Sequence, residues 1–162
     1  IVSIRVFFSY DYERDFWRVS EIKSYWVKKP GRESAGHIDE DFWESLKRQG
    51  DGEIKKWIRN QLLGTSVTVV MIGFETHGND YVNYEILQSQ ERNIGLLGVY
   101  IHNLEDSYDK KDFKGKNPFD NFRDKDSGLL FSQIYPTYDW VEDEGYDNFG
   151  NWVETAATLA GK

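Results

Sequence analysis

Residues 66–72 read SVTVVMI, a run dominated by β-branched and apolar side chains. Gly64 stands before this run and Gly73 follows it, so turn-forming residues bound it at the length of a strand. A strand that is apolar on both faces belongs in the middle of a sheet that is covered on both sides. The sequence therefore predicts a buried central strand at 66–72.

Further strands and helices are predicted on either side of this segment. Residues 4–9 (IRVFFS) alternate in a β-branched and aromatic pattern, and residues 95–101 (GLLGVYI) form a continuous apolar run. Apolar side chains recur every three or four residues, as on the buried face of a helix, over 16–26, 54–62, 81–93 and 149–157. Strands that alternate with helices indicate an α/β fold with a central, mostly parallel sheet and helices on both faces.

Three segments carry weaker patterns. A short strand is expected at 36–39, followed by an irregular loop over 41–52. Residues 102–128 are too polar and charged to form a core element, so they are expected to be irregular. Residues 132–140 (SQIYPTYDW) predict another strand. Pro136 cannot donate a ladder hydrogen bond, which places that strand at an edge of the sheet.

Length and composition limit the organisation and the chemistry of the chain. With 162 residues, no internal repeat and no low-complexity linker, residues 1–162 are expected to form a single domain. The absence of cysteine excludes disulfides, thiolate metal sites and cysteine nucleophiles. The three histidines lack the spacing of a zinc site, so no metal is expected.

Charge and hydropathy argue against nucleic-acid and membrane partners. The formal net charge is −8, and Lys and Arg are scattered, whereas generic nucleic-acid binding uses a clustered basic face. No stretch approaches the roughly 18 apolar residues of a membrane span. The first ten residues also lack the pattern of a signal peptide. We therefore expect a cytoplasmic protein.

Common nucleotide-binding and hydrolase motifs are absent. The chain contains neither GxxxxGK[ST] nor GxSxG, and the turn FSYDYERD (8–15) has no glycine for a GxGxxG fingerprint. A receiver domain would need an aspartate at the end of the 66–72 strand and a lysine after 133–140, and both are missing. P-loop NTPases, hydride-transferring Rossmann enzymes and receiver domains are therefore poor matches.

A ligand is expected at the carboxyl edge of the sheet. Open parallel sheets bind ligands beyond the carboxyl ends of their strands, which here are followed by 9–11, 73–75 and 102–103. The first of these segments leads into a helix, whose free N–H groups favour a phosphate. Arg14 either assists there or is an ordinary solvated residue.

Several motifs resemble the TIR superfamily. Residues 7–15 (FFSYDYERD) look like the first strand and turn of that fold. Residues 66–73 (SVTVVMIG) followed by 80–86 (DYVNYEI) look like its third strand and the helix that carries the catalytic glutamate. More specifically, the chain is similar to the TIR-like proteins of the Thoeris anti-phage system. That similarity runs in order through RVFFSY, SAGHID with DFWESLKRQGD, GTSVTVVMIG, YVNYEI, GLLGVYIHNL, KGKNPFD and YDWVEDEGYDNFGNWV.

The resemblance implies a flavodoxin-like TIR fold and an enzyme that consumes NAD. Members of the family are understood to cleave NAD, release nicotinamide and form a cyclic ADP-ribose isomer. That product acts as a second messenger and activates a separate NAD-consuming effector protein. NAD would be the substrate of this chain and no cofactor is expected. Such enzymes are often inactive until they are triggered.

The resemblance also assigns site residues by position. Glu85 corresponds to the catalytic glutamate, and Phe8, Ser9 and Tyr10 would line the floor of the substrate pocket. Tyr81 lies one helical turn before Glu85 and would stack on the substrate, although many TIR enzymes have Trp there. The residues alone also fit a solvated glutamate at Glu85, strand core at Phe8 and core packing at Tyr81.

Other functions remain open alongside the enzyme. Residues 41–52 occupy the place of the TIR BB loop, which in the family governs assembly and pocket access, so self-association through 41–52 is expected. One alternative is a non-enzymatic TIR-like module that recruits partners through its loops. Another is a sensor that holds NAD or its product without cleaving it.

Overall fold

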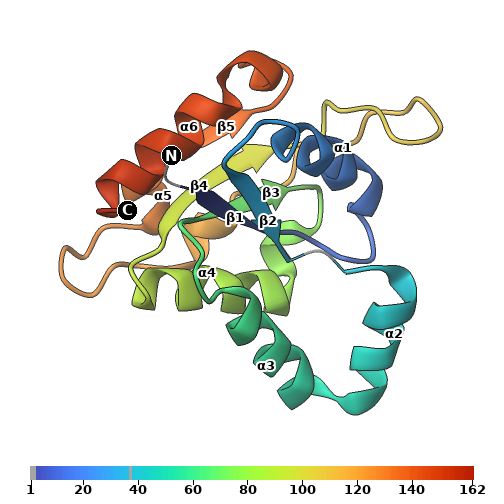
Figure 1. The fold of residues 1–162 in the computed structure, drawn as a ribbon, viewed down its shortest axis with the longest axis horizontal. Helices are drawn as coiled ribbons and strands as arrows, with labels where there is room; N and C mark the ends of the chain where they lie inside the picture. Colours follow the sequence, from blue (N-terminus) through green and yellow to red (C-terminus); the bar gives the residue numbers. More distant parts are fainter. Residues whose placement is uncertain (1–2, 37) are drawn as a thin grey trace.

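The computed structural model describes residues 3–36 and 38–162, which contain a five-stranded parallel sheet (Figure 1). The strand order is β2-β1-β3-β4-β5, the order of flavodoxin-like folds. The strands are β1 (Ile4–Ser9), β2 (Arg32–Ala35), β3 (Val67–Ile72), β4 (Gly95–Tyr100) and β5 (Thr137–Asp139). The predicted flavodoxin-like α/β fold with a parallel sheet is confirmed.

Strand β3 occupies the middle of the sheet, as its sequence predicted. Its Val69 pairs with Phe8 of β1 on one side and with Leu97 of β4 on the other. Every residue of β3 is buried. A strand in this position needs apolar side chains on both faces, because helices cover both faces of the sheet.

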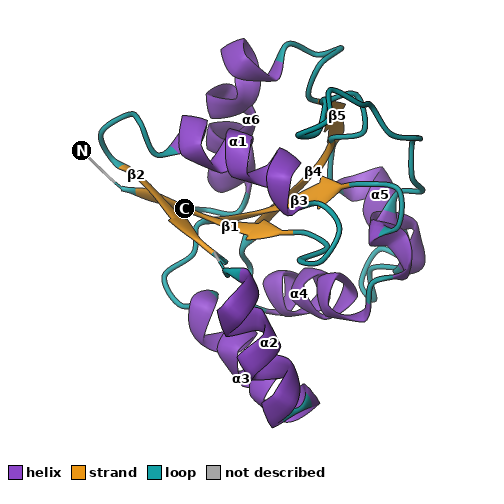
Figure 2. Ribbon diagram, turned by 90° about the vertical axis from the view of Figure 1, so that its right-hand side faces the viewer, coloured by secondary structure: helices purple, strands orange, loops and turns teal. Residues whose placement is uncertain are grey.

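Helices lie on the two sides of the sheet (Figure 2). Helices α1 and α6 cover one face, whereas α4 lies on the other, with α2 and α3 beyond it at one end of the molecule. The helices are α1 (Phe16–Trp26), α2 (Glu40–Gln49), α3 (Asp51–Gln61), α4 (Asp80–Glu91), α5 (Phe131–Ile134) and α6 (Gly145–Leu159). Two 3-10 turns are η1 (Thr76–Gly78) and η2 (Pro118–Asn121).

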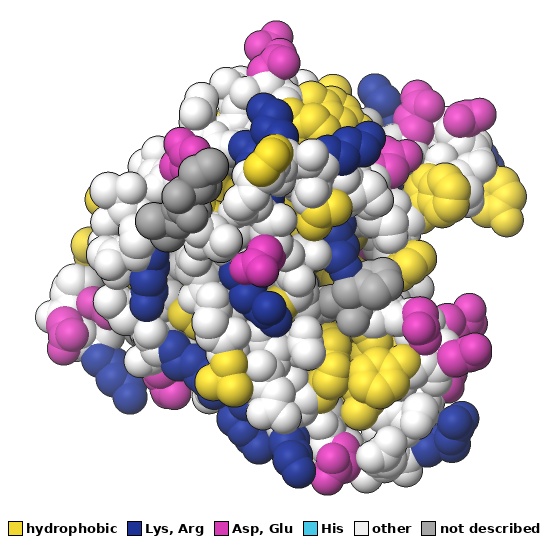
Figure 3. All heavy atoms as spheres, viewed as in Figure 1, with side chains coloured by type: hydrophobic (Ala, Val, Ile, Leu, Met, Phe, Trp, Pro, Cys, Tyr) yellow, Lys and Arg dark blue, Asp and Glu magenta, His cyan; other side chains and the backbone are white. Residues whose placement is uncertain are grey.

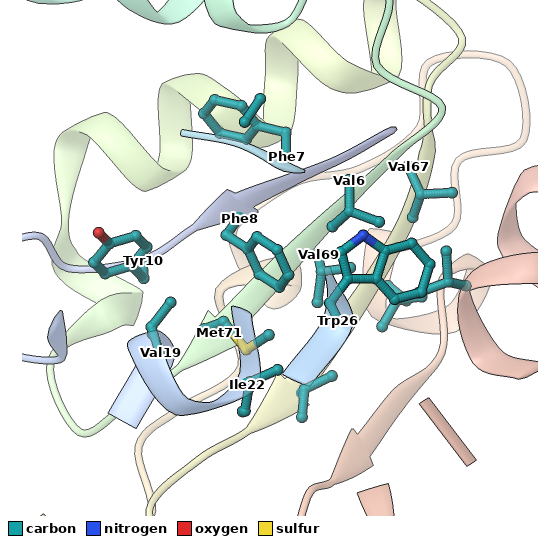
Figure 4. Close-up of a cluster of buried hydrophobic side chains, with 14 of the residues drawn as sticks. Val6, Phe7, Phe8, Tyr10, Val19, Ile22, Trp26, Val67, Val69 and Met71 are labelled. Carbon is teal, nitrogen blue, oxygen red and sulfur yellow. The ribbon is translucent and has the colours of Figure 1, made fainter. Parts of the chain in front are cut away.

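The core between the sheet and α1 is aromatic and aliphatic (Figure 4). Phe8 and Met71 from the sheet lie beside Ile22 and Trp26 from α1, and all four are fully buried. Successive side chains of a strand point to opposite faces. Phe8 therefore faces the α1 side, and its neighbour Ser9 faces the α4 side.

Two strand predictions need correction. The strand expected at 36–39 lies earlier in the chain: β2 ends at Ala35, and residue 37 lies outside the described residues. The strand expected over 132–140 is limited to β5, because α5 takes its first part and β5 begins immediately after Pro136. The carbonyl of Pro136 accepts the N–H of Gly98 at 3.0 Å, and β5 is an edge strand as predicted.

Most of segment 41–52 is helix α2, so the irregular loop expected there is a wrong prediction. Asp39 caps the helix, since its carboxylate accepts a backbone N–H of the first turn at 2.8 Å. Trp43 and Leu46 are the buried residues of α2, and the other side chains leave it largely polar. Gly50, at a φ of 103°, separates α2 from α3 in a conformation that favours glycine.

Residues 102–128 form the irregular segment that was predicted, apart from η2 and an isolated bridge at Arg123. Its first part is the yellow loop that extends at the upper right of Figure 1. On the face shown in Figure 3, Lys and Arg side chains are interspersed with Asp and Glu. Among the helices that the structure describes, none is both long and apolar enough to cross a membrane.

Candidate active site

Helix α4 carries Glu85 to the carboxyl end of β1. The helix begins at Asp80, and Asn79 caps it by accepting the backbone N–H groups of Tyr81 and Val82, each at 3.1 Å. Glu85 is one of the buried residues of α4, and none of its surface is exposed. The cap and the packing of α4 on the sheet therefore fix the position of the Glu85 carboxylate.

Two hydroxyl groups bind the carboxylate of Glu85. Ser9, the last residue of β1, donates from Oγ to Oε1 at 2.6 Å. Tyr12, in the turn that follows, donates from its phenol to Oε2 at 2.6 Å. Ser9 is fully buried and Tyr12 is nearly so. Each oxygen of the Glu85 carboxyl group therefore has a short hydrogen bond.

Burial dominates the electrostatics of this group. It raises the pKa of Glu85 to about 8, although the hydrogen bonds from Ser9 and Tyr12 act in the opposite direction. Burial, followed by the charge of Glu85, holds the pKa of Tyr12 well above its usual value. A carboxyl group that titrates near neutral pH beside a pocket is typical of functional sites.

A pocket of about 540 Å³ lies beside Tyr12. Its lining residues are Asp11, Tyr12, Glu13, Trp43, Lys47, Asp51, Ile54, Gly78, Asn79, Asp80 and Tyr81. Four of these side chains are carboxylates and one is an amine, so the pocket has a negative formal charge. Glu85 does not line the pocket, whereas Tyr12 both lines it and binds Glu85. The carboxylate therefore lies behind Tyr12.

Aromatic rings form much of the pocket wall. The ring centroid of Trp43 lies 5.1 Å from that of Tyr12 and 5.8 Å from that of Tyr81. The phenol of Tyr81 donates to Asp51 at 3.0 Å and so links α4 to α3. Burial and then this hydrogen bond raise the pKa of Tyr81 to about 12. The wall is thus held by contacts among α2, α3 and α4.

The structure brings together most of the residues that the sequence singled out. Ser9 binds Glu85, Tyr10 contacts the ring of Tyr12 with 4.7 Å between centroids, and Tyr81 lines the pocket. Tyr10 is itself 2% exposed, so it supports Tyr12 and is not a lining residue of this pocket.

Phe8 was predicted to line the floor of the pocket, and the structure places it elsewhere. Its ring is fully buried and lies 6.3 Å from the ring of Phe149 in α6. Helix α6 covers the face of the sheet opposite α4 (Figure 2). Phe8 is therefore strand core, because the alternation along β1 that turns Ser9 toward Glu85 turns Phe8 away.

Sequence reasoning missed three residues of the site: Tyr12, Trp43 and Lys47. Tyr12 lies in the FFSYDYERD motif, two residues after Tyr10, so its place in the turn after β1 was the available signal. Trp43 and Lys47 belong to α2, and the expectation of an irregular loop concealed them. The whole wall that α2 provides was therefore missing from the prediction.

Arg14 does not face this pocket as a free cation. Its guanidinium binds Asp112 at 2.5 Å and lies 3.5 Å from a carboxylate oxygen of Glu75. Within residues 3–36 and 38–162, His, Asp and Glu side chains do not gather in groups of three or more that could hold a metal ion. The polar chemistry of the site rests on Glu85 and the hydroxyl groups around it.

Comparisons with known proteins identify the family. Residues 7–106 match the family model described as the TIR-like domain of the Thoeris protein ThsB. A protein of Bacillus cereus (strain MSX-D12), named "Putative cyclic ADP-D-ribose synthase ThsB1", is 32% identical over 189 residues of alignment. This alignment covers 92% of the present chain and 98% of the relative. The chain belongs to the TIR-like family of Thoeris ThsB proteins.

Proposed function

We propose that this protein cleaves NAD between nicotinamide and ribose and closes the remaining ADP-ribose into a cyclic isomer. This product would be a second messenger in anti-phage defence. Membership of the ThsB family and the name of the B. cereus relative support the reaction. The observation that carries the proposal is the buried carboxyl group of Glu85, which Ser9 and Tyr12 hold beside an aromatic pocket.

Glu85 suits the cleavage step because that step creates positive charge on a sugar. As the bond to nicotinamide breaks, its electron pair leaves with the nicotinamide, which departs as a neutral molecule. The ribose becomes an oxocarbenium-like cation, which the ionised form of Glu85, whose fraction grows as the pH rises toward the pKa of about 8, stabilises directly or through a ribose hydroxyl. Because the leaving group is neutral on departure, neither a general acid nor a metal is required.

Cyclisation follows when an atom of the adenine end attacks the same sugar carbon. A new bond forms there and one proton is released, so that NAD yields nicotinamide, a cyclic ADP-ribose isomer and a proton. Water must be kept from the cation during this step. The buried position of Glu85 supports such exclusion.

Tyr12 must give way before the sugar reaches the carboxylate. Both oxygens of Glu85 are occupied, and Tyr12 stands between Glu85 and the pocket. We propose that a ribose hydroxyl of NAD replaces the hydrogen bond from Tyr12. Because the replacement is also a hydroxyl donor, the carboxylate keeps two partners throughout.

The pocket suits the nicotinamide end of NAD in particular. The nicotinamide ring is cationic while it is attached to ribose, and the pocket carries four carboxylates against one amine. Trp43 and Tyr81 present aromatic rings, which attract a cationic ring placed over them. Charge and stacking therefore favour the same orientation of the substrate.

Two further parts of the proposal concern partners. We propose that the cyclic product activates a separate NAD-consuming effector, and that the segment 41–52 takes part in self-association. Phe42 of α2 supports the second point, because its ring is 41% exposed although it contacts Trp57 at 6.1 Å between centroids. Sedimentation of wild type and Phe42→Ser would test self-association without reference to catalysis.

The proposed reaction is tested by incubating the purified protein with NAD. Nicotinamide release and the mass of the second product are followed for wild type, Glu85→Gln and Glu91→Gln. We expect Glu85→Gln to fold but to lose at least about a hundredfold in rate, because it cannot carry the stabilising charge. Glu91→Gln removes an exposed carboxylate at the end of the same helix and should retain activity.

Full activity in Glu85→Gln would show that the site is wrong. The enzyme is expected to need a trigger, so extracts of phage-infected cells are included as an activator. Wild-type protein that stays silent under that condition would favour the scaffold function. Binding of NAD without cleavage would favour the sensor.

A further inference from the structure

A second pocket lies across η1 from the candidate active site. Its volume is about 460 Å³, and its lining residues are Phe74, Glu75, His77, Gly78, Lys114, Gly115 and Lys116. Gly78 lines both pockets, so the turn η1 is the partition between them. Both pockets border the chain that follows β3, at the sheet edge where α/β folds bind ligands.

Two lysines of this second pocket have no acidic partner. Among the described residues, no carboxylate lies within ion-pair distance of Lys114 or Lys116, and the amine of Lys114 lies 4.5 Å from the ring centroid of Tyr100. Glu75 is the acidic residue of the lining, and it is paired with Arg14 at 3.5 Å. The pocket is therefore a local positive site in a chain whose net charge is −8.

The segment that carries these lysines is held firmly against the end of β3. A Cβ atom on Gly115 would lie 2.1 Å from the carbonyl oxygen of Gly73, so only glycine permits this approach. On one side of the segment, the N–H of Asp112 donates to the carbonyl of His102 at 2.8 Å. On the other side, Phe119 is fully buried. The two amines thus extend from a backbone that is already in position.

The charges of the two pockets match the charges of NAD. The active-site pocket has an excess of carboxylates and the second pocket has an excess of amines. NAD is cationic at its nicotinamide ring and anionic at its diphosphate. We propose that Lys114 and Lys116 bind the diphosphate of NAD while the nicotinamide ribose enters the pocket beside Glu85. This inference rests on the proposed function, and it leaves the adenine free to turn back for cyclisation.

The assignment is tested with Lys114→Ala, Lys116→Ala and the double variant. The matched control is Lys125→Ala, which removes an exposed lysine that lines neither pocket. Calorimetric titration with ADP-ribose measures binding of the diphosphate without any cleavage of nicotinamide. Steady-state nicotinamide release from NAD gives KM and kcat, and circular dichroism checks the fold.

We expect the double variant to bind ADP-ribose at least about tenfold more weakly than wild type. Its KM for NAD should rise by a similar factor while kcat changes little, because the lysines bind substrate and do not take part in bond cleavage. Lys125→Ala should match wild type in all of these measurements. Binding of adenosine, which lacks the diphosphate, should be the same in every variant.

Equal affinity for ADP-ribose in wild type and the double variant would overturn the inference. Failure of wild type to bind ADP-ribose would overturn it as well, as would an equal loss in Lys125→Ala. The proposed function fails on different results, namely full activity in Glu85→Gln or no nicotinamide release from triggered wild type. Whether or not the protein cleaves NAD, the calorimetric comparison shows whether Lys114 and Lys116 bind a diphosphate.

Discussion

Glu85 is a residue at which the cost of burial opposes the proposed function. Removing a carboxylate from water is costly, and the two hydroxyl donors offset only part of that cost, since the pKa of Glu85 is still raised to about 8. A neutral side chain that kept its hydrogen bonds with Ser9 and Tyr12 would avoid this desolvation cost. Sites that trade stability for activity in this way are common in enzymes. The cost of burying Glu85 can be measured through the pH dependence of the unfolding free energy.

Replacing Glu85 with Gln should make folding stability less dependent on pH. The pKa of Glu85 is about 8 in the folded protein and 4.5 as its ordinary value. A raised pKa means that the contribution of the protonated group is fully present below pH 4.5 and is lost as pH rises through about 8. Between pH 5 and pH 8, the unfolding free energy of wild type should fall by about 3.5 kcal/mol more than that of Glu85→Gln. Urea denaturation at several pH values measures this difference.

A second buried carboxyl requires the comparison to be made at matched pH. Burial raises the pKa of Asp15 to about 7, so Asp15 titrates in the same window. Its effect is shared by wild type and Glu85→Gln and cancels in their difference. Parallel stability curves for the two proteins would contradict a strongly raised pKa at Glu85.

Helix α2 shows how one element shapes the site from outside the sheet. It supplies Trp43 and Lys47 to the pocket, and it reaches the turn after β1 through hydrogen bonds from both residues to Glu13. Asp39 caps the helix and Gly50 separates it from α3. The placement of the pocket wall therefore depends on a short helix whose own stability is limited, because isolated helices of this length are marginal.

Loss of the α2 cap should affect substrate binding more than chemistry. Asp39→Ala removes the hydrogen bond to the N–H of Phe42 and should lower the unfolding free energy by about 1 kcal/mol. The KM for NAD should rise while kcat stays close to wild type, since Glu85 and its donors lie outside α2. Asp41→Ala is the control, because it removes the same charge from the first turn without removing the cap. Equal KM values for wild type and Asp39→Ala would show that α2 does not form part of the binding wall.

The strength of a local pattern determined which elements could be predicted. The continuous apolar runs of β3 and β4 and the helical spacing of α1 and α4 were read correctly, because each pattern covers a whole element. The apolar residues of α2, Phe42, Trp43 and Leu46, have helical spacing, but they stand among polar residues, and the segment was therefore predicted to be a loop. Strand β5 is only three residues long, too short for its own pattern to separate it from α5 before it. Short elements depend on their tertiary neighbours, which a sequence pattern does not contain.

On the scale of the whole molecule, the strand order assembles the candidate site. Ser9 and Glu85 are separated by 76 positions, yet the parallel pairing of β1 with β3 places the end of β1 beside α4. Family motifs pointed to Ser9 and Glu85, and the fold accounts for their contact. The motif placed Tyr12 in the turn after β1, but its hydrogen bond to Glu85 could not be predicted, because that bond depends on how the turn packs against α4.

The most direct test of the central claim is a crystal structure of Glu85→Gln with NAD bound. The predicted result places the ribose of the nicotinamide end against residue 85, with the phenol of Tyr12 displaced and the nicotinamide ring beside Trp43 and Tyr81. The variant is suitable because it should bind NAD without cleaving it. NAD bound at a distance while Ser9 and Tyr12 still enclose residue 85 would contradict the claim that this carboxyl group meets the substrate.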